Sequence, residues 1–163
     1  MALARAALPP EPESKRRLRL WLRLYGACSV IEREMRRFLR ARFATTLPRF
    51  DLMAALDRAP DGLTMGELSR RLMVSGGNVT SIVGGLERDA LVCRRQPASD
   101  RRTTYVALTE RGRAAFAAMA RAHEHWINQL LADVADDDID ALTDLLAELT
   151  HKAEAAAEAG RTR

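Results

Sequence analysis

The stretch that most constrains this chain runs from residue 63 to residue 109, and it reads as two short helices followed by a basic hairpin. Thr64 and Glu67 have the spacing of a capping box, in which a threonine hydroxyl and a glutamate carboxylate satisfy the free amides of a helix start. The pattern predicts that a helix begins directly after the threonine. The apolar period breaks at residues 74–77, and a second helix is expected to begin at Ser75. Two helices joined by a tight turn form a helix-turn-helix.

The second helix is expected to have one apolar side and one side of short groups. Its apolar residues recur at three- and four-residue steps and should face the core: Val79, Ile82, Val83 and Leu86. Its other side carries Gly76, Gly77, Asn78, Thr80, Ser81, Gly84 and Gly85. A glycine inside a helix costs about 1 kcal/mol relative to alanine, so a need for close approach to another surface would explain the last two. Such a face suits a DNA major groove, with Asn78 on an adenine edge. A short core helix with a solvated face explains the helix alone equally well.

A basic hairpin follows and favours DNA binding. Residues 90–95 and 103–108 have strand patterns, and residues 96–102 supply turn residues. Arginine forks match phosphate oxygens and can enter a narrow minor groove. Asp100 is close enough in sequence to orient the guanidinium of Arg102. The predicted DNA contacts are therefore Ser75, Gly76, Gly77, Asn78, Thr80 and Ser81 from the helix, and Arg94, Arg95, Asp100, Arg101 and Arg102 from the hairpin.

These residues resemble the MarR family of winged helix-turn-helix regulators. The resemblance lies in the segments GLTMGEL at 62–68, NVT at 78–80 with LERDALV at 86–92, and DRR at 100–102 leading into LTERG at 108–112. It extends over roughly residues 15 to 157. It implies a mainly α-helical subunit with a small β-hairpin wing, in which long N- and C-terminal helices pair two chains. The sequence departs from the family at Ala90, where glycine usually ends the recognition helix.

The flanking segments predict the rest of the organisation. We expect a flexible tail over residues 1–14, an N-terminal dimerisation helix over 15–46, the winged helix-turn-helix over 47–113 and C-terminal dimerisation helices over 114–163. Ser14 and either Thr45 or Thr46 are the expected caps of the first two helices, and Thr109 caps the helix after the wing. Apolar stripes mark the two terminal helices: Trp21, Leu24, Tyr25, Cys28, Ile31, Met35, Phe38 and Leu39 in the first, and Ile139, Leu142, Leu145, Leu146 and Leu149 in the last. In so small a subunit, both stripes favour a homodimer.

Charge and composition limit the possible functions. Residues 1–63 carry 13 basic and 7 acidic groups, residues 64–113 carry 9 and 5, and residues 114–163 carry 4 and 10. The basic parts suit a polyanion such as double-stranded DNA.

No signal peptide and no membrane span is recognisable, which predicts a cytoplasmic protein. Two cysteines, Cys28 and Cys93, do not make a disulfide framework. His123 and His125 have poor spacing for a metal pair, and with no nucleophile motif or phosphate loop the sequence predicts neither an enzyme nor a metal or cofactor site.

Aromatic and arginine residues in the first two helices suggest an apolar anionic effector. The candidate ligand residues are Trp21, Tyr25, Cys28, Arg36, Arg40, Phe43, Arg49 and Phe50, in a cleft between the dimer helices and the winged domain. The family resemblance implies aromatic acids, or aromatic acyl-CoA thioesters for relatives that share the Leu-Pro-x-Phe-Asp segment found here at 47–51. The resulting hypothesis is a repressor that a small aromatic ligand releases from a pseudo-palindromic operator. Three alternatives remain: a redox-sensing regulator that uses Cys28, a winged helix that contacts protein, and a nonspecific nucleoid-type binder.

Overall fold

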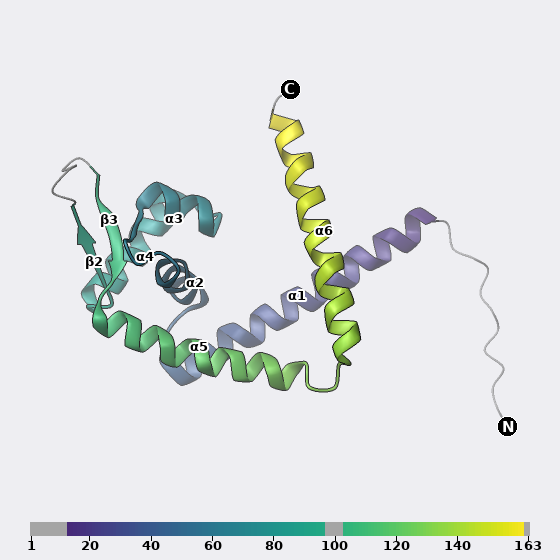
Figure 1. Cartoon of the computed structure of the whole chain (residues 1–163), viewed down its shortest axis with the longest axis horizontal. Helices are drawn as coiled ribbons and strands as arrows, with labels where there is room; N and C mark the ends of the chain where they lie inside the picture. Colours follow the sequence, from purple (N-terminus) through teal and green to yellow (C-terminus); the bar gives the residue numbers. More distant parts are fainter. Residues whose placement is uncertain (1–12, 97–102, 162–163) are drawn as a thin grey trace. The chain divides into compact units, whose positions relative to one another are not determined.

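The structure is a computed structural model that describes residues 13–96 and 103–161 of the chain. Within these ranges its helices and strands are α1 (Glu13–Phe43), α2 (Leu47–Asp57), β1 (Leu63–Thr64), α3 (Met65–Leu72), α4 (Gly76–Arg88), β2 (Val92–Arg95), β3 (Tyr105–Leu108), α5 (Glu110–Leu130) and α6 (Asp136–Arg161) (Figure 1). The chain divides into two compact units, one ending at Met119 and one beginning at Ala120. The expected fold is confirmed: a mainly helical chain with a small antiparallel sheet.

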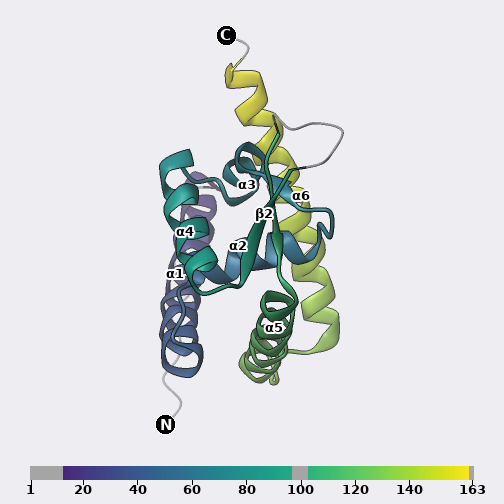
Figure 2. The same cartoon turned by 90° about the vertical axis from the view of Figure 1, so that its left-hand side faces the viewer.

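The sheet holds the predicted hairpin and one strand that the sequence did not reveal. Strands β2 and β3 pair antiparallel, with Val92 opposite Leu108 and Arg95 opposite Tyr105. The two-residue strand β1 pairs with the other edge of β3, so the strand order is β1-β3-β2. Figure 2 shows β2 of this sheet from the side on which the hairpin lies in Figure 1. Because β1 leads directly into α3, this pairing ties the base of the wing to the start of the helix-turn-helix.

The core lies where the helices of the winged domain meet this sheet. Its largest fully buried side chains are Leu39, Leu52, Met53, Leu56, Leu68, Leu86, Val79, Val83 and Val106. The rings of Phe50 of α2 and Phe116 of α5 lie tilted against each other, with their centroids 5.5 Å apart. Apolar burial on this scale, about 25 cal/mol for each Å² removed from water, stabilises the domain that carries α4 and the wing.

The helix starts agree with the sequence in part. The capping box is present: the Glu67 amide donates to Thr64 Oγ1 at 3.3 Å, and the Thr64 amide donates to Glu67 Oε2 at 2.8 Å. Thr109 caps α5, since its Oγ1 accepts from the Gly112 amide at 2.9 Å. The expected cap at Ser14 is wrong, because α1 already begins at Glu13.

Two further caps differ from the usual chemistry. Thr46 is the N-cap residue of α2 and Ser75 that of α4, but neither side chain makes a capping hydrogen bond. Because the Ser75 backbone is extended, with φ at −63° and ψ at 150°, helix α4 begins at Gly76, one residue later than expected. Pro48 lies in the first turn of α2, where a missing N–H is tolerated.

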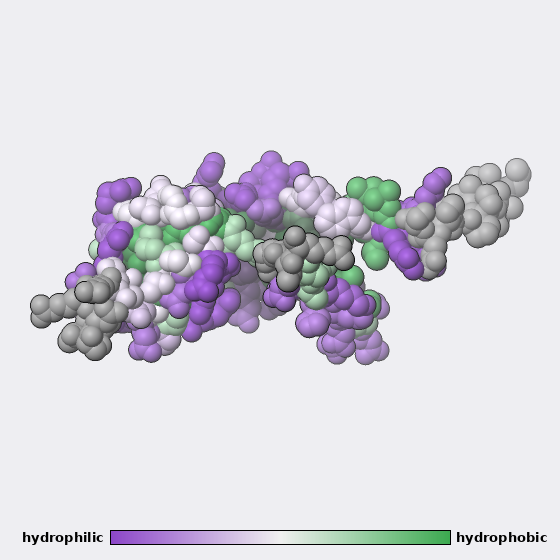
Figure 3. Space-filling model, turned by 90° about the horizontal axis from the view of Figure 1, so that it is seen from above, coloured by the Kyte–Doolittle hydropathy of each residue, from purple (hydrophilic) through white to green (hydrophobic). Residues whose placement is uncertain are grey.

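The apolar stripes of the terminal helices are largely exposed in the single chain. On α1 only Met35 and Leu39 of the predicted stripe are buried, whereas Tyr25 is 62% exposed. Figure 3 shows hydrophobic side chains uncovered toward the N-terminal end of α1. On α6, Leu142, Leu145, Leu146 and Leu149 are all exposed. Among the described residues no helix has the length and apolar content needed to cross a membrane.

Candidate nucleic-acid interface

Helix α4 presents one buried side and one exposed side, as the sequence predicts. Val79, Val83 and Leu86 are fully buried, and Ile82 is half-buried. The exposed side carries all six predicted contact residues of this helix: Ser75, Gly76, Gly77, Asn78, Thr80 and Ser81. A Cβ added at Gly76 or Gly77 would meet no atom within 4 Å. The helix start is therefore a low surface that can approach another backbone closely.

The polar groups on this surface differ in what they can donate. The Thr80 hydroxyl donates to the Gly76 carbonyl oxygen at 2.9 Å, so its proton is used inside the helix. Asn78 has an amide that both donates and accepts, which is the pattern that pairs with an adenine edge in the major groove. Of the residues on this face, Asn78 is thus best suited to read a base.

The turn between α3 and α4 is held by local hydrogen bonds. Met73 adopts the left-handed conformation, with φ at 52°, and its side chain is 91% exposed. Ser69 Oγ donates to the Val74 carbonyl oxygen at 2.6 Å, and the Val74 amide donates back to the Ser69 carbonyl oxygen at 3.2 Å. This reciprocal pair fixes the angle at which α4 leaves α3.

The wing is tied to α4 by an ion pair. Arg94 Nε of β2 donates to both carboxylate oxygens of Glu87, at 3.0 and 3.2 Å. A bond between charged groups is stronger than a neutral one and restrains both side chains. Arg94 therefore holds the wing against α4, while its neighbour Arg95 is exposed on the strand. The predicted tip contacts Asp100, Arg101 and Arg102 lie outside the described residues.

The turn at the end of α4 is bonded to the start of α5. Ala90 has φ at 58°, in the left-handed region that favours glycine. Its carbonyl oxygen accepts from Thr109 Oγ1 at 2.8 Å, and the Thr109 amide donates to the Leu91 carbonyl oxygen at 3.0 Å. A Cβ at Gly112 would lie 1.9 Å from the Leu91 carbonyl oxygen, so the close packing of α5 on this turn requires a glycine.

Comparison with known proteins agrees with this geometry. A family model described as the MarR family matches residues 45–103. The transcriptional activatory protein BadR of Rhodopseudomonas palustris is 31% identical over 144 residues, which cover 85% of this chain and 82% of that protein. The chain belongs to the MarR family. The HTH-type transcriptional repressor YetL of Bacillus subtilis is 26% identical, over 81% of this chain and 79% of its own length.

A solved structure extends the similarity to the fold. The MarR family transcriptional regulator from Silicibacter pomeroyi matches with a TM-score of 0.72 and 31% identity, over 88% of this chain and 99% of that chain. The protein is accordingly a MarR-family transcription regulator with a winged-helix DNA-binding fold. The helix-turn-helix and wing described above are the parts of that fold that carry the predicted DNA contacts.

A cavity of about 320 Å³ lies at the turn that ends α4 in this MarR-family chain. Phe43, Met53, Ala115, Ala118 and Met119 supply apolar wall, and the charged side chains that line it are Arg49, Asp89 and Arg111. Arg49 of α2 forms an ion pair with Asp89, the C-cap residue of α4. The Arg49 hydrogen bond and charge are the main reasons that the pKa of Asp89 is lowered, and Arg88 and Arg111 add to the effect.

The predicted ligand residues are not gathered in one place. Phe43 and Arg49 line the cavity together, whereas Phe50 is buried in the core against Phe116. Trp21, Tyr25 and Cys28 lie on the exposed part of α1, and at 1.5 Å of rise per residue Cys28 is about 22 Å along the helix axis from Phe43. The effector role of this outer group remains a prediction.

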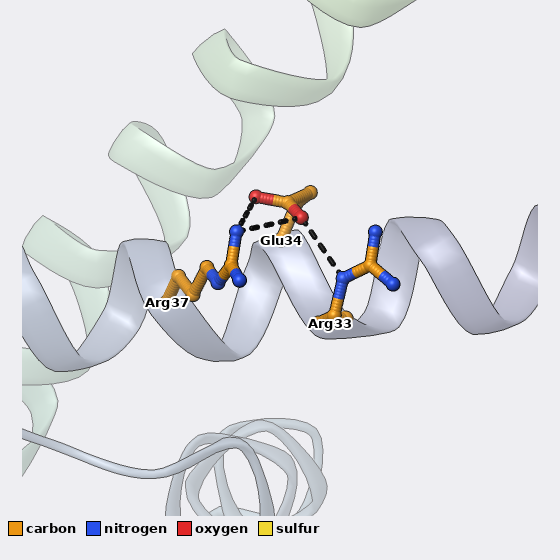
Figure 4. A network of polar contacts seen from close by, with 3 residues as sticks. All are labelled: Arg33, Glu34 and Arg37. Atoms are coloured by element: carbon orange, nitrogen blue, oxygen red, sulfur yellow. Dashed lines mark hydrogen bonds and ion pairs between the residues drawn. The ribbon is translucent and has the colours of Figure 1, made fainter.

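The arginines of α1 are partly neutralised within the helix. Arg36 pairs with the Glu32 carboxylate one turn away, and it lines a separate groove of about 200 Å³. Figure 4 shows Glu34 between Arg33 and Arg37, with Arg33 Nε at 3.1 Å and Arg37 Nη1 at 3.2 Å from Glu34 Oε1. The hydrogen bond from Arg33 lowers the pKa of Glu34. Arg40 is exposed on the same helix.

Sequence reasoning missed three residues of this region. Glu87, Asp89 and Arg111 were not singled out as functional residues, although all three lie in segments on which the family resemblance rests. Their charges looked like those of any solvated helix end. Only the partners show the roles of the two carboxylates. Arg49 lies 40 residues before Asp89, and Arg94 belongs to the strand that follows the helix of Glu87.

Proposed function

We propose that this MarR-family protein acts as a homodimer that binds a pseudo-palindromic operator, represses transcription, and leaves the DNA when a small aromatic acid binds. The observation that carries DNA reading is the low, exposed face of α4 beside an arginine-bearing wing. In a winged-helix arrangement a helix lies in the major groove and the wing lies on the neighbouring DNA backbone. The helix can then contact bases while the wing contacts phosphates.

The terminal helices support the dimer. Their exposed apolar side chains form larger uncovered stripes than a monomer usually tolerates. The charges are complementary as well, since α1 carries ten basic and three acidic residues while α6 carries two and eight. Pairing two chains through these helices would set the two α4 helices about one turn of DNA apart.

The cavity at the turn that ends α4 supports an aromatic acid as the effector. Its walls combine apolar side chains with two guanidiniums and the carboxylate of Asp89. A volume of about 320 Å³ is at the lower end of ligand pockets, which fits a single-ring acid. The nucleotide part of an acyl-CoA thioester would have to lie outside it. We therefore place the free acid before the thioester among candidate effectors.

Binding-site selection from random DNA, followed by gel-shift titration, tests the reading function. Asn78→Ala should weaken binding to the selected sequence by about 1–3 kcal/mol and to scrambled DNA very little. Arg102→Ala should weaken binding to both sequences and lower the salt slope by about 1 per subunit. Asn128→Ala, an exposed asparagine on α5, is the control and should change neither.

Two outcomes would contradict the proposal. Selection that enriches no sequence, with a steep salt dependence, would indicate a nonspecific binder. No DNA binding at all would favour a winged helix that contacts protein. Transcription from the selected site with and without the protein decides between repression and activation.

A further inference from the structure

The most exposed large hydrophobic side chain among the described residues belongs to Met73, in the turn between α3 and α4. Its exposed fraction is 91%, whereas the next most exposed, Leu20 and Tyr25, reach 62% and lie on α1. Over the described residues 47–96 and 103–113, Met73 is the one large hydrophobic side chain that is exposed. Pairing of the terminal helices with a second chain would cover the exposed stripes of α1 and α6, but it gives no reason for the exposure of Met73.

The backbone conformation of Met73 is costly as well. Its φ of 52° and ψ of 37° lie in the left-handed region, where the Cβ is crowded and glycine is the usual residue. The end of α3 uses this conformation, because the Met73 amide donates to the Arg70 carbonyl oxygen at 3.3 Å. A glycine would make the same turn without strain. Strained positions cluster at functional sites, so a strained residue with an uncovered apolar side chain indicates a contact outside the chain.

The position of Met73 limits what that contact can be. Three residues later α4 begins with Gly76 and Gly77, which present no side chain. The first turn of a recognition helix is the part that reaches base edges in the major groove. Because the start of α4 is so low, it does not shield the long side chain directly before it from the groove.

The chemistry of the side chain selects among the groups that DNA offers there. A thioether carries no charge and is a weak hydrogen-bond acceptor, so phosphates and the polar edges of bases are poor partners for it. The 5-methyl group of thymine is the apolar group that base pairs present in the major groove. An unbranched and polarisable side chain can adjust to the position of such a group.

We infer that Met73 is a specificity-determining residue that contacts the 5-methyl group of a thymine in the half-site read by α4. The inference rests on the proposed function and adds a residue to the recognition of the operator. Asn78 would supply hydrogen bonds to one base, and Met73 an apolar contact to another. Loss of either contact should therefore relax the sequence preference at a different position of the half-site.

Replacing single thymines of the selected DNA by deoxyuridine tests the contact, because uracil differs from thymine only by the missing methyl group. At one position of a half-site, this change should weaken binding of the unaltered protein about fourfold, the effect of leaving one methyl group uncovered. Met73→Ala should bind the thymine-containing DNA about fourfold more weakly per half-site and show no further loss with deoxyuridine. Met73→Leu, which keeps an apolar side chain, should keep most of the thymine dependence.

Met73→Gly separates the contact from the structure of the turn. This variant relieves the left-handed strain, so its melting temperature should rise by about 2–4 °C, while its DNA binding should match that of Met73→Ala. Ala44→Gly, at another left-handed position with φ at 48°, is the matched control. It should raise the melting temperature in the same way and leave the thymine dependence intact. A residue that only shaped the turn would not lose DNA recognition as the protein became more stable.

Several results would overturn the inference while the proposed function stands. One is equal affinity of Met73→Ala and the unaltered protein for the selected DNA. Another is a thymine dependence that is absent from the unaltered protein or survives in Met73→Ala, because the methyl group would then be uncontacted or contacted by another residue. Unchanged DNA affinity with altered transcription would assign Met73 to a protein partner instead. Selection that enriches no sequence at all would overturn both the inference and the proposed function.

Discussion

Ala90 holds the turn between the recognition helix and the wing in a conformation that L-residues seldom adopt. With φ at 58°, its Cβ crowds its own carbonyl, at a cost of about 1–2 kcal/mol. Ala90→Gly should therefore stabilise the protein by about 1 kcal/mol in urea unfolding. Ala117→Gly, at an exposed site on α5, is the matched control and should destabilise by a similar amount. Destabilisation by both variants would show that the turn at Ala90 is unstrained.

Gly112 illustrates the opposite constraint, because its neighbour leaves no room for a side chain. Gly112→Ala would place a Cβ 1.9 Å from the Leu91 carbonyl oxygen, so either α5 or the turn must move. We expect a loss of about 1–3 kcal/mol or more in the free energy of unfolding. Gly66→Ala in α3, where a Cβ meets nothing within 4 Å, should be neutral or slightly stabilising. Thermal melts of both variants decide the point.

At the scale of elements, the capping box of α3 should make part of the stability depend on pH. The Thr64 amide, by its hydrogen bond, is the main cause that lowers the pKa of Glu67 below its ordinary 4.5. A carboxyl with a lower pKa in the folded state contributes stability above its unfolded pKa, and that contribution is lost as the pH falls through the folded pKa. The melting-temperature gap between the unaltered protein and Glu67→Gln should therefore be widest near pH 7 and close toward pH 3. A gap that stays constant with pH would contradict a role for the charge.

The wing should use its two neighbouring arginines differently. Arg94 is held by Glu87, whereas Arg95 is exposed one residue further along β2. Since an arginine already paired with a carboxylate releases less counterion on binding, Arg95→Ala should lower the salt slope of DNA binding by about 1 per subunit and Arg94→Ala by clearly less. Glu87→Gln is the matched test, because it should let Arg94 behave like Arg95. Equal salt slopes for the two alanine variants would mean that the Glu87–Arg94 ion pair breaks when the protein binds DNA.

For the whole molecule, the exposed stripe on α6 should be the part that needs a second chain. Light scattering should give twice 18.1 kDa for the unaltered protein. Leu142→Glu combined with Leu145→Glu puts two charges into the stripe and should give a monomer, because burying them would cost far more than two leucines gain. Ala147→Glu, exposed on the other side of the helix, should remain a dimer. A dimer that survives the double change would place the interface elsewhere.

Much of the architecture follows from local patterns that a sequence displays. The capping box at Thr64, the period of Val79, Val83 and Leu86, and the basic hairpin each depend on residues close together in the chain. Local hydrogen bonds and helical or strand periodicity are properties of short segments, so they can be predicted without knowing the fold. The predicted DNA-binding face of α4 followed from the same period, because the residues that do not enter the core must face outward.

Other features depend on partners that only the tertiary structure brings together. Strand β1 is two residues long and exists because β3 offers it an edge. The cavity exists because the end of α1, α2, the turn after α4 and α5 come together without filling the space between them. The predicted effector cluster was drawn from residue types along α1 and α2, but a helix 31 residues long spreads such residues over tens of ångströms. The Arg49–Asp89 pair spans 40 residues of sequence, and no periodicity links its members. Contacts of this kind are set by how the elements pack. The sequence by itself therefore determined the helix-turn-helix and the wing. The tertiary structure decided the Arg49–Asp89 ion pair and the cavity that these two residues line.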